Sequence, residues 1–457
     1  MESFDSLSLS PALQRGIDAL GYTAPTPVQA QALPVILAGR DVIAQAPTGS
    51  GKTAAFGLGL LHALDAGLIR TQALVLCPTR ELADQVAGQL RKLAVGIPNL
   101  KVLTLCGGMP LAPQLASLET HDPQVVVGTP GRIQELLRKK ALHLSGVRML
   151  VLDEADRMLD MGFEEALREI LGKLPKARQS LLFSATFSDG VREMARTGLH
   201  NAQEITVGGE ARPVAVEQRF VEVDPSRKQP TLAALLLQHR PESAVVFCNT
   251  RREVDEVAGS LSHYGFSALA LHGDMEQRDR EEVLLRFANR SCNVLVASDV
   301  AARGLDIDDL AMVVNHDLPS DADTYVHRIG RTGRAGRGGI ALTMTTPRER
   351  PRVEAMAEKL AVALAWDRPP PPPNARSAPP AAMATLRIDA GKTDKLRAGD
   401  ILGALTGEAG LPGKAIGKIN IFATRSYVAV ETGKAAQALA RLGQGKIKGR
   451  SFRVRRI

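Results

Sequence analysis

The sequence predicts an α/β protein in which two parallel-sheet domains follow one another and a small α+β domain completes the chain. Its 457 residues are too many for one hydrophobic core. Short runs of Val, Leu and Ile recur, each followed by a helix-compatible stretch, as expected for strands that helices cover on both faces of a parallel sheet. Polar residues follow each run, and the carboxyl ends of such strands are where open α/β sheets bind ligands. Examples are ALVLCPTRE, QVVVGTPGR, MLVLDEAD and SLLFSAT, and later AVVFCNTRR, NVLVASDV and MVVNHD.

Changes in composition mark the domain boundaries. We predict that the first domain spans residues 1–207, that GGEARPVAV at 208–216 forms a hinge, and that the second domain spans 217–366. The Pro-rich stretch 367–382 fits neither a helix nor an inner strand, so we expect a semi-rigid spacer there. The remaining residues, 383–457, alternate as strand, helix, strand, strand, helix and strand, which is the order of RNA recognition modules.

Composition is typical of a soluble globular protein, with 44% hydrophobic and 23% charged residues. The four cysteines lie far apart, without CxxC pairs or histidines at ligand spacing, so we expect free thiols and no zinc site. The N-terminal stretch has no signal-peptide pattern, and no apolar run approaches about 18 residues. We therefore expect a cytoplasmic monomer with no membrane partner.

Positive charge is concentrated at the C-terminal end. Residues 383–457 carry 15 Lys and Arg against 5 Asp and Glu, a net charge of +10, whereas the rest of the chain carries −2. Charge of this density indicates a phosphate backbone or an anionic membrane surface as the partner. Because the stretch lacks the apolar face with aromatics that a membrane-surface helix needs, a nucleic acid is the expected partner.

A glycine-rich stretch after the strand-like DVIAQ has the pattern of a P-loop. It consists of Ala46, Pro47, Thr48, Gly49, Ser50, Gly51, Lys52 and Thr53. Such a turn aims backbone N–H groups at phosphates, while Lys52 supplies a cation to the β- and γ-phosphates and the Thr53 hydroxyl binds Mg²⁺. The stretch opens with Ala46 instead of glycine, so its first turn must form without a residue that is free to adopt positive φ.

Two acids follow the strand-like MLVL. Asp153 is placed to hold Mg²⁺, and Glu154 is placed to polarise an attacking water. Adjacent acids after a strand also occur as the first turn of a helix. The P-loop pattern earlier in the chain favours the catalytic interpretation.

The stretch YVHRIGRTGRAGR, residues 325–337, carries Arg328, Arg331, Arg334 and Arg337 at a spacing of three. On a helix these arginines would share one face and could simply be solvated. Hydrolysis of a γ-phosphate also needs positive charge, which is worth about 10³ to 10⁵ in rate when an arginine finger supplies it. Arginines placed in the second domain would make hydrolysis depend on closure of the two domains.

With these motifs in order, the chain resembles the DEAD-box ATP-dependent RNA helicases over about residues 4–345. The matching motifs are GYTAPTPVQ, APTGSGKT, PTRELA, a Gly-Gly pair, TPGR, VLDEAD and SAT, then VVFCNT, LHGD, SDVAARGLD and HRIGRTGR. The resemblance implies two RecA-like domains, ATP and Mg²⁺ as cofactors, and local disruption of RNA duplexes when ATP and RNA close the lobes. The family often has Thr where Ser298 stands, and the hydroxyl is preserved.

The resemblance also implies roles for single residues, beside Lys52, Thr53, Asp153 and Glu154 of the P-loop and acidic motifs. Phe4 would stack on adenine, Gln29 would hydrogen-bond its edge, and Asp306 would bind the ribose. The residues implied in catalysis and its coupling to unwinding are Ser184, Thr186, His327, Arg331 and Arg334, with the two arginines on the γ-phosphate. The implied RNA contacts are Arg80, Gly108, Thr129, Arg132, Thr250, Gly273 and Ser298.

Residues 383–457 resemble the ribosomal-RNA-binding domain of the DbpA subfamily of these helicases. That resemblance implies targeting to a hairpin of large-subunit (23S) ribosomal RNA and a role in large-subunit assembly, with pre-ribosomal particles as partners. The third strand offers only Tyr427 as an aromatic and the first offers none, so base stacking on the sheet is not the expected mode. The candidate RNA contacts are the cations Lys392, Lys395, Arg397, Lys446, Lys448, Arg450, Arg453 and Arg455. In the last strand, Phe452 and Val454 are expected to face the domain's core.

Two other functions stay open from the sequence. A DNA helicase or translocase shares the two-lobe core, although the Q motif, the DEAD sequence and the C-terminal domain favour RNA. An ATP-gated RNA clamp or assembly scaffold would bind without unwinding. Intact Lys52, Glu154, Arg331 and Arg334 disfavour an inactive ATPase, but slow hydrolysis used only for release is compatible with them.

Overall fold

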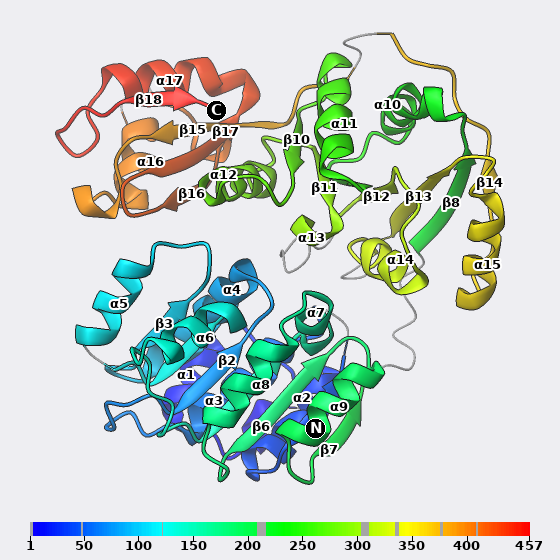
Figure 1. Ribbon diagram of the computed structural model, residues 1–457. Coiled ribbons are helices and arrows are strands. Elements are labelled where there is room, and N and C mark those ends of the chain that lie inside the picture. The colour runs from blue at the N-terminus through cyan, green and yellow to red at the C-terminus, as the bar shows by residue number, and fades with distance from the viewer. Residues whose placement is uncertain are drawn as a thin grey trace. The chain divides into compact units, whose positions relative to one another are not determined.

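The structure, a computed structural model, describes residues 3–46, 49–120, 122–207, 216–302, 310–333, 338–374, 378–407 and 410–457. The chain divides into two compact units. The first comprises the described residues up to Val207, and the second comprises those from Val216 onward. The first unit contains one sheet and the second contains two (Figure 1).

The first unit is built on a seven-stranded parallel sheet of order β3-β4-β2-β5-β6-β1-β7. Its strands are β1 (Val42–Gln45), β2 (Ala73–Leu76), β3 (Val102–Leu105), β4 (Val125–Gly128), β5 (Met149–Asp153), β6 (Gln179–Ser184) and β7 (Gln203–Thr206). Its helices are α1 (Pro11–Ala19), α2 (Pro27–Leu37), α3 (Lys52–Ala63), α4 (Arg80–Leu93), α5 (Leu111–Thr120), α6 (Pro130–Arg138), α7 (Ala155–Asp160), α8 (Glu164–Lys173) and α9 (Asp189–Gly198), with 3₁₀ turns η1 (Phe4–Ser6) and η2 (Ala94–Gly96).

Both faces of this sheet are buried, because successive strand residues point to opposite sides. On β2, Ala73 and Val75 join the core formed with helices α1 to α4, while Leu74 and Leu76 join the core formed with α6 to α9. The prediction of near-continuous apolar strands covered on both faces is confirmed.

The second unit begins with a further seven-stranded parallel sheet, of order β10-β11-β9-β12-β13-β8-β14. Its strands are β8 (Val216–Glu222), β9 (Ala244–Cys248), β10 (Ala268–Leu271), β11 (Val294–Ser298), β12 (Met312–Asn315), β13 (Gly339–Thr345) and β14 (Trp366–Asp367). Its helices are α10 (Lys228–His239), α11 (Arg251–His263), α12 (Gln277–Ala288), α13 (Asp299–Ala302), α14 (Ala322–Ile329) and α15 (Arg350–Leu360), with η3 (Pro225–Arg227). Taken in chain order, the strands of the two sheets follow the same topology, so the predicted tandem repeat of RecA-like domains is confirmed.

The second unit ends with a four-stranded antiparallel sheet of order β16-β17-β15-β18. Its strands are β15 (Met383–Ile388), β16 (Ile416–Ile421), β17 (Ser426–Glu431) and β18 (Val454–Arg456), and its helices are α16 (Ala398–Thr406) and α17 (Ala435–Gln444), with η4 (Lys392–Asp394), η5 (Gly413–Ala415) and η6 (Thr432–Lys434). The element order is the predicted β-α-β-β-α-β. Phe452 and Val454 pack against the core between sheet and helices, as predicted, and Arg453 and Arg455 are exposed.

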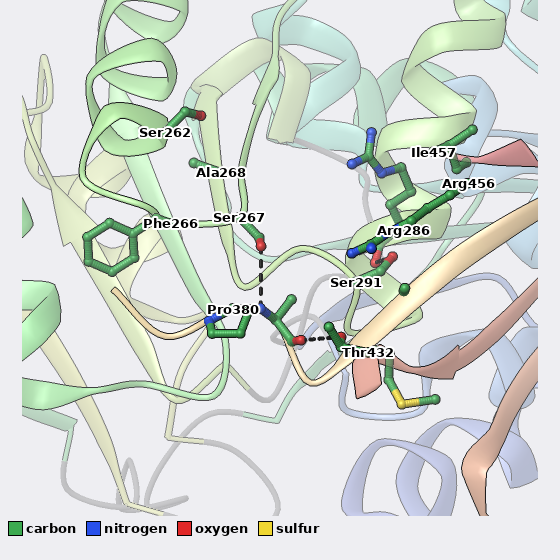
Figure 2. A pocket seen from close by; sticks show the side chains of 13 residues that line it. Ser262, Phe266, Ser267, Ala268, Arg286, Ser291, Pro380, Thr432, Arg456 and Ile457 are labelled. Carbon is green, nitrogen blue, oxygen red and sulfur yellow. Dashed lines mark hydrogen bonds between the residues drawn. The ribbon is translucent and has the colours of Figure 1, made fainter. Parts of the chain in front are cut away.

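The other face of this small sheet packs against the second RecA-like domain. Thr385, Arg387 and Tyr427 alternate with the core-facing residues yet are at most 9% exposed. The Tyr427 hydroxyl donates to Glu282 Oε2 on α12 at 3.2 Å, and the Thr385 and Ser291 hydroxyls lie 2.6 Å apart. A pocket opens at the edge of this junction (Figure 2). The C-terminal domain is thus attached through its sheet.

The domain boundaries can be compared with the ends of the strands. β8 begins at Val216, the last position of the predicted hinge, and the hinge residues before it lie outside the described residues. β14 ends at Asp367, one position into the predicted spacer. Near the end of the spacer, the Ala378 N–H donates to Tyr264 O at 3.1 Å and Ala381 is buried, so this part of it contacts the second RecA-like domain.

All four cysteines are buried free thiols, as the spacing predicted. Burial raises the pKa of each thiol. Among the described residues, no helix is long and apolar enough to cross a membrane.

Candidate functional site

The P-loop follows β1 and leads into α3. Gly51 caps that helix with φ of 93°, and a Cβ there would lie 2.4 Å from Gln29 Nε2. Glycine is therefore required both by the left-handed backbone and by the close approach of Gln29. Gly49 also has positive φ, at 80°. Pro47 and Thr48 lie outside the described residues.

Lys52 is the first residue of α3 and is 6% exposed. Its ammonium donates to the carbonyl oxygen of Ala46 at 3.0 Å. Ala46 does not adopt positive φ, so the loop turns at Gly49 and Gly51 and tolerates the missing first glycine. Thr53 lies in the first turn of α3 and is half-buried.

Gln29 links the N-terminal segment to the P-loop. Its Nε2 donates to Gly51 O at 3.0 Å, and its Oε1 accepts from the Thr26 N–H at 2.9 Å. Both ends of the amide are therefore engaged within the protein, where the resemblance implied a contact with the adenine edge. Phe4 is 2% exposed, and its ring stacks on Tyr22 with centroids 6.4 Å apart.

Asp153 ends β5 and is 2% exposed. Burial raises the pKa of Asp153 to about 7, against the opposing effect of Lys52. Its Oδ1 has no hydrogen-bond partner within the described chain. A buried carboxylate oxygen without a hydrogen-bond partner is a hard oxygen ligand of the kind that Mg²⁺ prefers.

Glu154 has a left-handed backbone, with φ of 54°, which is uncommon for a residue other than glycine. Its Oε2 accepts from Arg157 Nη1 at 2.7 Å, and both side chains are 6% exposed. The carboxylate is thus held by an arginine in this structure.

Asp156, a residue to which the motifs assigned no role, organises the SAT segment. Its Oδ2 accepts from the backbone N–H groups of Ala185 and Thr186 and from the Thr186 hydroxyl, at 3.0 to 3.2 Å. The Ser184 hydroxyl in turn accepts from the Asp156 N–H at 3.3 Å. The signal in the sequence was a third acid in VLDEAD, three positions after Asp153. Ser184 and Thr186 are thereby tied to the acidic motif.

Four predicted RNA contacts of the first unit lie together. The Thr129 hydroxyl accepts from the Gly107 N–H at 3.1 Å, and Arg132 donates to Met109 O at 2.9 Å. Gly108 has φ of 72°, and a Cβ there would lie 3.5 Å from Arg80 Nη1. The loop after β3 therefore brings Arg80, Thr129 and Arg132 to one place.

In the second unit, the predicted RNA contacts lie at the ends of strands and the start of a helix. Thr250 caps α11 in a capping box with Glu253. Gly273 is exposed between β10 and α12, and Ser298 ends β11 with 8% exposure. Arg280 donates to His272 O and Ala301 O at 3.3 and 3.4 Å, which links α12 to two of these loops.

The arginine stretch is only partly helical. α14 ends at Ile329, so Arg331 lies beyond it and the interpretation of one solvated helical face is wrong. Arg328 is 2% exposed and donates to both carboxylate oxygens of Asp299 at 2.7 Å, because burial of a guanidinium requires a partner. Arg331 is 6% exposed, and His327 is half-buried on α14. Asp306, Arg334 and Arg337 lie outside the described residues.

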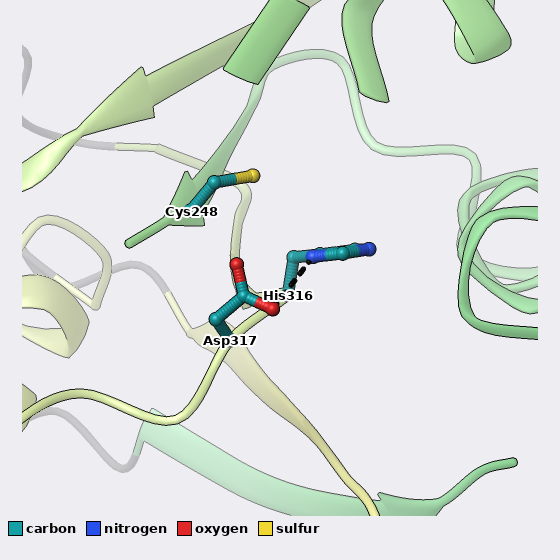
Figure 3. Close-up of side chains that lie close together, drawn as sticks. All are labelled: Cys248, His316 and Asp317. Carbon is teal, nitrogen blue, oxygen red and sulfur yellow. Dashed lines mark hydrogen bonds and ion pairs between the residues drawn. The ribbon is translucent and has the colours of Figure 1, made fainter. Parts of the chain in front are cut away.

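Cys248, His316 and Asp317 have potential ligand atoms within 4.8 Å of one another (Figure 3). Asp317 Oδ1, however, is bound by the Lys228 ammonium at 2.8 Å as well as by His316 Nδ1 at 3.0 Å. Burial would raise the pKa of Asp317, but the His316 hydrogen bond and the Lys228 charge hold it well below its ordinary value. Lys228 already supplies the positive charge that a metal would bring, so this cluster stabilises the fold.

The C-terminal cations predicted to bind RNA come from two loops that touch. Lys448 Nζ donates to Lys395 O at 3.0 Å, which joins the turn before β18 to the loop after β15. The turn is closed by paired Ile447 and Arg450, with positive φ at Lys448 and Gly449 as in a type I′ turn. All eight cations predicted to contact RNA are exposed: Lys392, Lys395, Arg397, Lys446, Lys448, Arg450, Arg453 and Arg455.

Tyr427, by contrast, is 1% exposed beneath α12. Its ring meets Phe422 edge-on at 5.7 Å. The sheet face on which RNA recognition modules stack bases is thus covered by the second RecA-like domain.

Three protein-family models together match most of the chain. Residues 26–194 match the DEAD/DEAH box helicase family, residues 227–336 match the helicase conserved C-terminal domain, and residues 385–456 match the DbpA RNA-binding domain. The chain therefore belongs to the DEAD-box family of ATP-dependent RNA helicases. Within that family it carries the DbpA type of RNA-binding domain.

Two relatives of known name are similar to this chain over different lengths. The chain is 50% identical to the ATP-dependent RNA helicase DbpA of Escherichia coli (strain K12), over 100% of this chain and 99% of that protein. It is 44% identical to the ATP-dependent RNA helicase CshA of Listeria monocytogenes over 76% of this chain and 67% of that protein. The similarity to CshA thus spans 350 residues, whereas that to DbpA spans 456.

Solved structures agree on the fold. Saccharomyces cerevisiae Dbp5 bound to RNA and ADP BeF3 matches with TM-score 0.70 and 32% identity, over 80% of this chain and 96% of that chain. Mss116p bound to single-stranded RNA and AMP-PNP matches with TM-score 0.73 and 28% identity, over 81% of this chain and 80% of that one.

The buried pair of Lys228 and Asp317 yields a prediction about stability. We expect Lys228→Met to lower the free energy of unfolding by about 2 to 4 kcal/mol at pH 7, because it leaves Asp317 buried without its cation. A depressed carboxyl pKa stabilises the fold above the unfolded value of about 4 and loses that effect as pH falls through the folded value. The deficit should therefore shrink as the pH falls below about 4. The free energy of unfolding is measured by urea unfolding, followed by the fluorescence of Trp366, the sole tryptophan.

The matched control is Lys359→Met, at an exposed position in the last turn of α15, which should cost less than about 0.5 kcal/mol. A deficit for Lys228→Met that stays constant between pH 7 and 3 would contradict the assigned ion pair.

Proposed function

We propose that this ATP-dependent RNA helicase unwinds short RNA duplexes locally and is directed by its C-terminal domain to a hairpin of large-subunit (23S) ribosomal RNA, during assembly of the large ribosomal subunit. The observation that carries the proposal is the pair of touching basic loops, Lys392–Arg397 and Lys446–Arg450, on a domain whose sheet is attached to the second RecA-like domain. The full-length similarity to DbpA supports it.

The ATP step uses the carboxyl edge of the first sheet. Backbone N–H groups of the P-loop and the Lys52 ammonium bind the phosphates, and the Thr53 hydroxyl and Asp153 carboxylate would hold Mg²⁺. When bound there, Mg²⁺ would neutralise the charge that develops on the phosphate. Its charge would also keep Asp153 ionised, where burial alone raises the pKa to about 7. Glu154 exchanges Arg157 for a water and aligns it with the γ-phosphate.

Coupling of this step to RNA runs through Asp156. Because Asp156 binds the backbone of Ala185 and Thr186, any shift of the acidic motif moves the SAT segment. Arg331 and Arg334 of the second domain complete the charge around the γ-phosphate, so hydrolysis awaits closure of the lobes.

RNA is held by both lobes in the closed state. Arg80, Thr129 and Arg132 of the first lobe and Thr250, Gly273 and Ser298 of the second contact the backbone of one strand. An RNA strand that is bent by the two sets of contacts cannot stay paired with its complementary strand. The enzyme releases the bound strand after ATP hydrolysis. The enzyme acts as a cytoplasmic monomer.

Glu154→Gln tests the catalytic assignment. It should lower RNA-stimulated phosphate release by about a hundredfold or more, since the amide cannot accept a proton from water. ATP binding, measured by fluorescence of a labelled nucleotide, should persist. Glu165→Gln, an exposed glutamate on α8, is the control with full activity. Intact phosphate release by Glu154→Gln would refute its role.

Targeting is tested by ATPase stimulation with a panel of RNAs. Stimulation by large-subunit ribosomal RNA should exceed that by unrelated RNA, and Lys446→Gln/Lys448→Gln/Arg450→Gln should abolish the difference. Lys414→Gln/Lys418→Gln/Lys434→Gln removes the same charge from other exposed positions of the domain and should preserve it. Removal of residues 383–457 should likewise abolish the difference in stimulation between ribosomal and unrelated RNA. Equal stimulation by all RNAs in the unaltered protein would refute the targeting.

The strength of phosphate contacts is read from salt dependence. If about five of the cations neutralise phosphates, the slope of log K against log [KCl] for hairpin binding should be roughly −3 to −5. The Lys446/Lys448/Arg450 variant should reduce the slope by roughly 2 to 3 units, measured by fluorescence anisotropy. An unchanged slope would assign binding to other residues.

A further inference from the structure

A pocket of about 250 Å³ lies where the second RecA-like domain meets the C-terminal domain (Figure 2). Arg286 and Ser291 line it from α12 and the loop that follows, and Met383, Thr432 and Arg456 line it from the C-terminal domain. The helicase motifs and the touching basic loops do not include these residues. The pocket is therefore separate from the sites described above.

The charged side chains that line the pocket are cationic. Arg286 and Arg456 both contribute, and no Asp or Glu side chain is among the described lining residues. Within the described chain, neither arginine forms an ion pair with a carboxylate. The Arg286 Nε is buried and has no hydrogen-bond partner there. A buried guanidinium N–H without an acceptor is costly, and an anion in the pocket would remove that cost.

The polar groups of the wall also suit an oxyanion. The Ser267 hydroxyl accepts from the Ala381 N–H at 3.4 Å, so its own proton can be donated into the pocket. Guanidinium groups bind phosphate oxygens in pairs of parallel hydrogen bonds. The volume is below the roughly 300 to 1,000 Å³ of pockets for drug-sized ligands, and it suits a group of phosphate or pyrophosphate size.

We propose that this pocket binds a phosphate group, held by Arg286 of the second RecA-like domain and Arg456 of the C-terminal domain. Because the two arginines come from different domains, the bound anion draws them together and relieves their mutual repulsion. An anion that binds only the attached state then favours attachment over separation, by an amount that rises with the logarithm of the anion concentration once the site is occupied.

Methionine methyl NMR gives a local test on the full chain. Met383 lines the pocket, and its signal is assigned with Met383→Leu. All samples carry Lys52→Ala, so that the P-loop does not compete for the anion. Titration with pyrophosphate at constant ionic strength should shift the Met383 signal to saturation. Arg286→Gln and Arg456→Gln should each weaken the apparent affinity about tenfold or more, since each removes a charged hydrogen bond.

The matched control is Arg278→Gln, an exposed arginine on the same helix that does not line the pocket. It should leave the titration unchanged. Unaltered signals of Met312 and Met344, both fully buried in the second domain, report that each variant is folded. A Met383 signal that does not respond to pyrophosphate, or that responds equally in Arg286→Gln and Arg278→Gln, would overturn the proposal.

A second titration, with a short single-stranded RNA, identifies the source of the phosphate. Competition between RNA and pyrophosphate at Met383 would assign the site to a backbone phosphate. A pyrophosphate response that RNA does not affect would assign it to free phosphate.

Discussion

The alignment of parallel strands is the constraint on which the ATP site depends. Hydrogen bonding in register brings the carboxyl ends of β1, β4, β5 and β6 to one edge of the first sheet. The Ala46 N–H at the start of the P-loop donates to Ser184 O of the SAT segment at 3.0 Å. Phosphate binding, metal binding and the coupling segment are therefore adjacent because the sheet is parallel. Any change of register would separate them.

Asp153, Glu154 and Asp156 belong to one short motif and are all buried. The cost of burying each carboxyl group is offset in a different way. Burial raises the pKa of Asp153 to about 7. Glu154 forms an ion pair with Arg157, and Asp156 accepts hydrogen bonds from backbone N–H groups. Buried carboxylates differ in function when their surroundings differ. Asp153, with one unpartnered oxygen, suits a cation. Glu154, with an exchangeable partner, suits catalysis, and Asp156, with fixed partners, suits transmission.

The C-terminal domain shows how a common fold is adapted when its usual binding face is occupied. Tyr427 and Arg387 lie under α12, so the sheet serves attachment, and exposed cations are left on the loops after β15 and before β18. Attachment to α12 also matters because the same helix carries Arg280, which contacts loops of the helicase motifs. RNA bound to the basic loops would thereby hold a fixed relation to the second RecA-like domain.

By itself the sequence determined the local features: apolar runs as strands, the P-loop, the order β-α-β-β-α-β, and the inward positions of Phe452 and Val454. Each depends on short-range periodicity or on residue types at fixed spacing, which a sequence displays directly. Only the tertiary structure decided that Arg328 is buried on Asp299, that Asp156 holds the SAT segment, that Glu154 is paired with Arg157, and that Tyr427 is covered. Three of these four depend on partners 28 or more positions away in the chain, brought near only when the sheets assemble. The pairing of Glu154 is local, but it follows from a left-handed backbone conformation that a glutamate in the sequence does not predict.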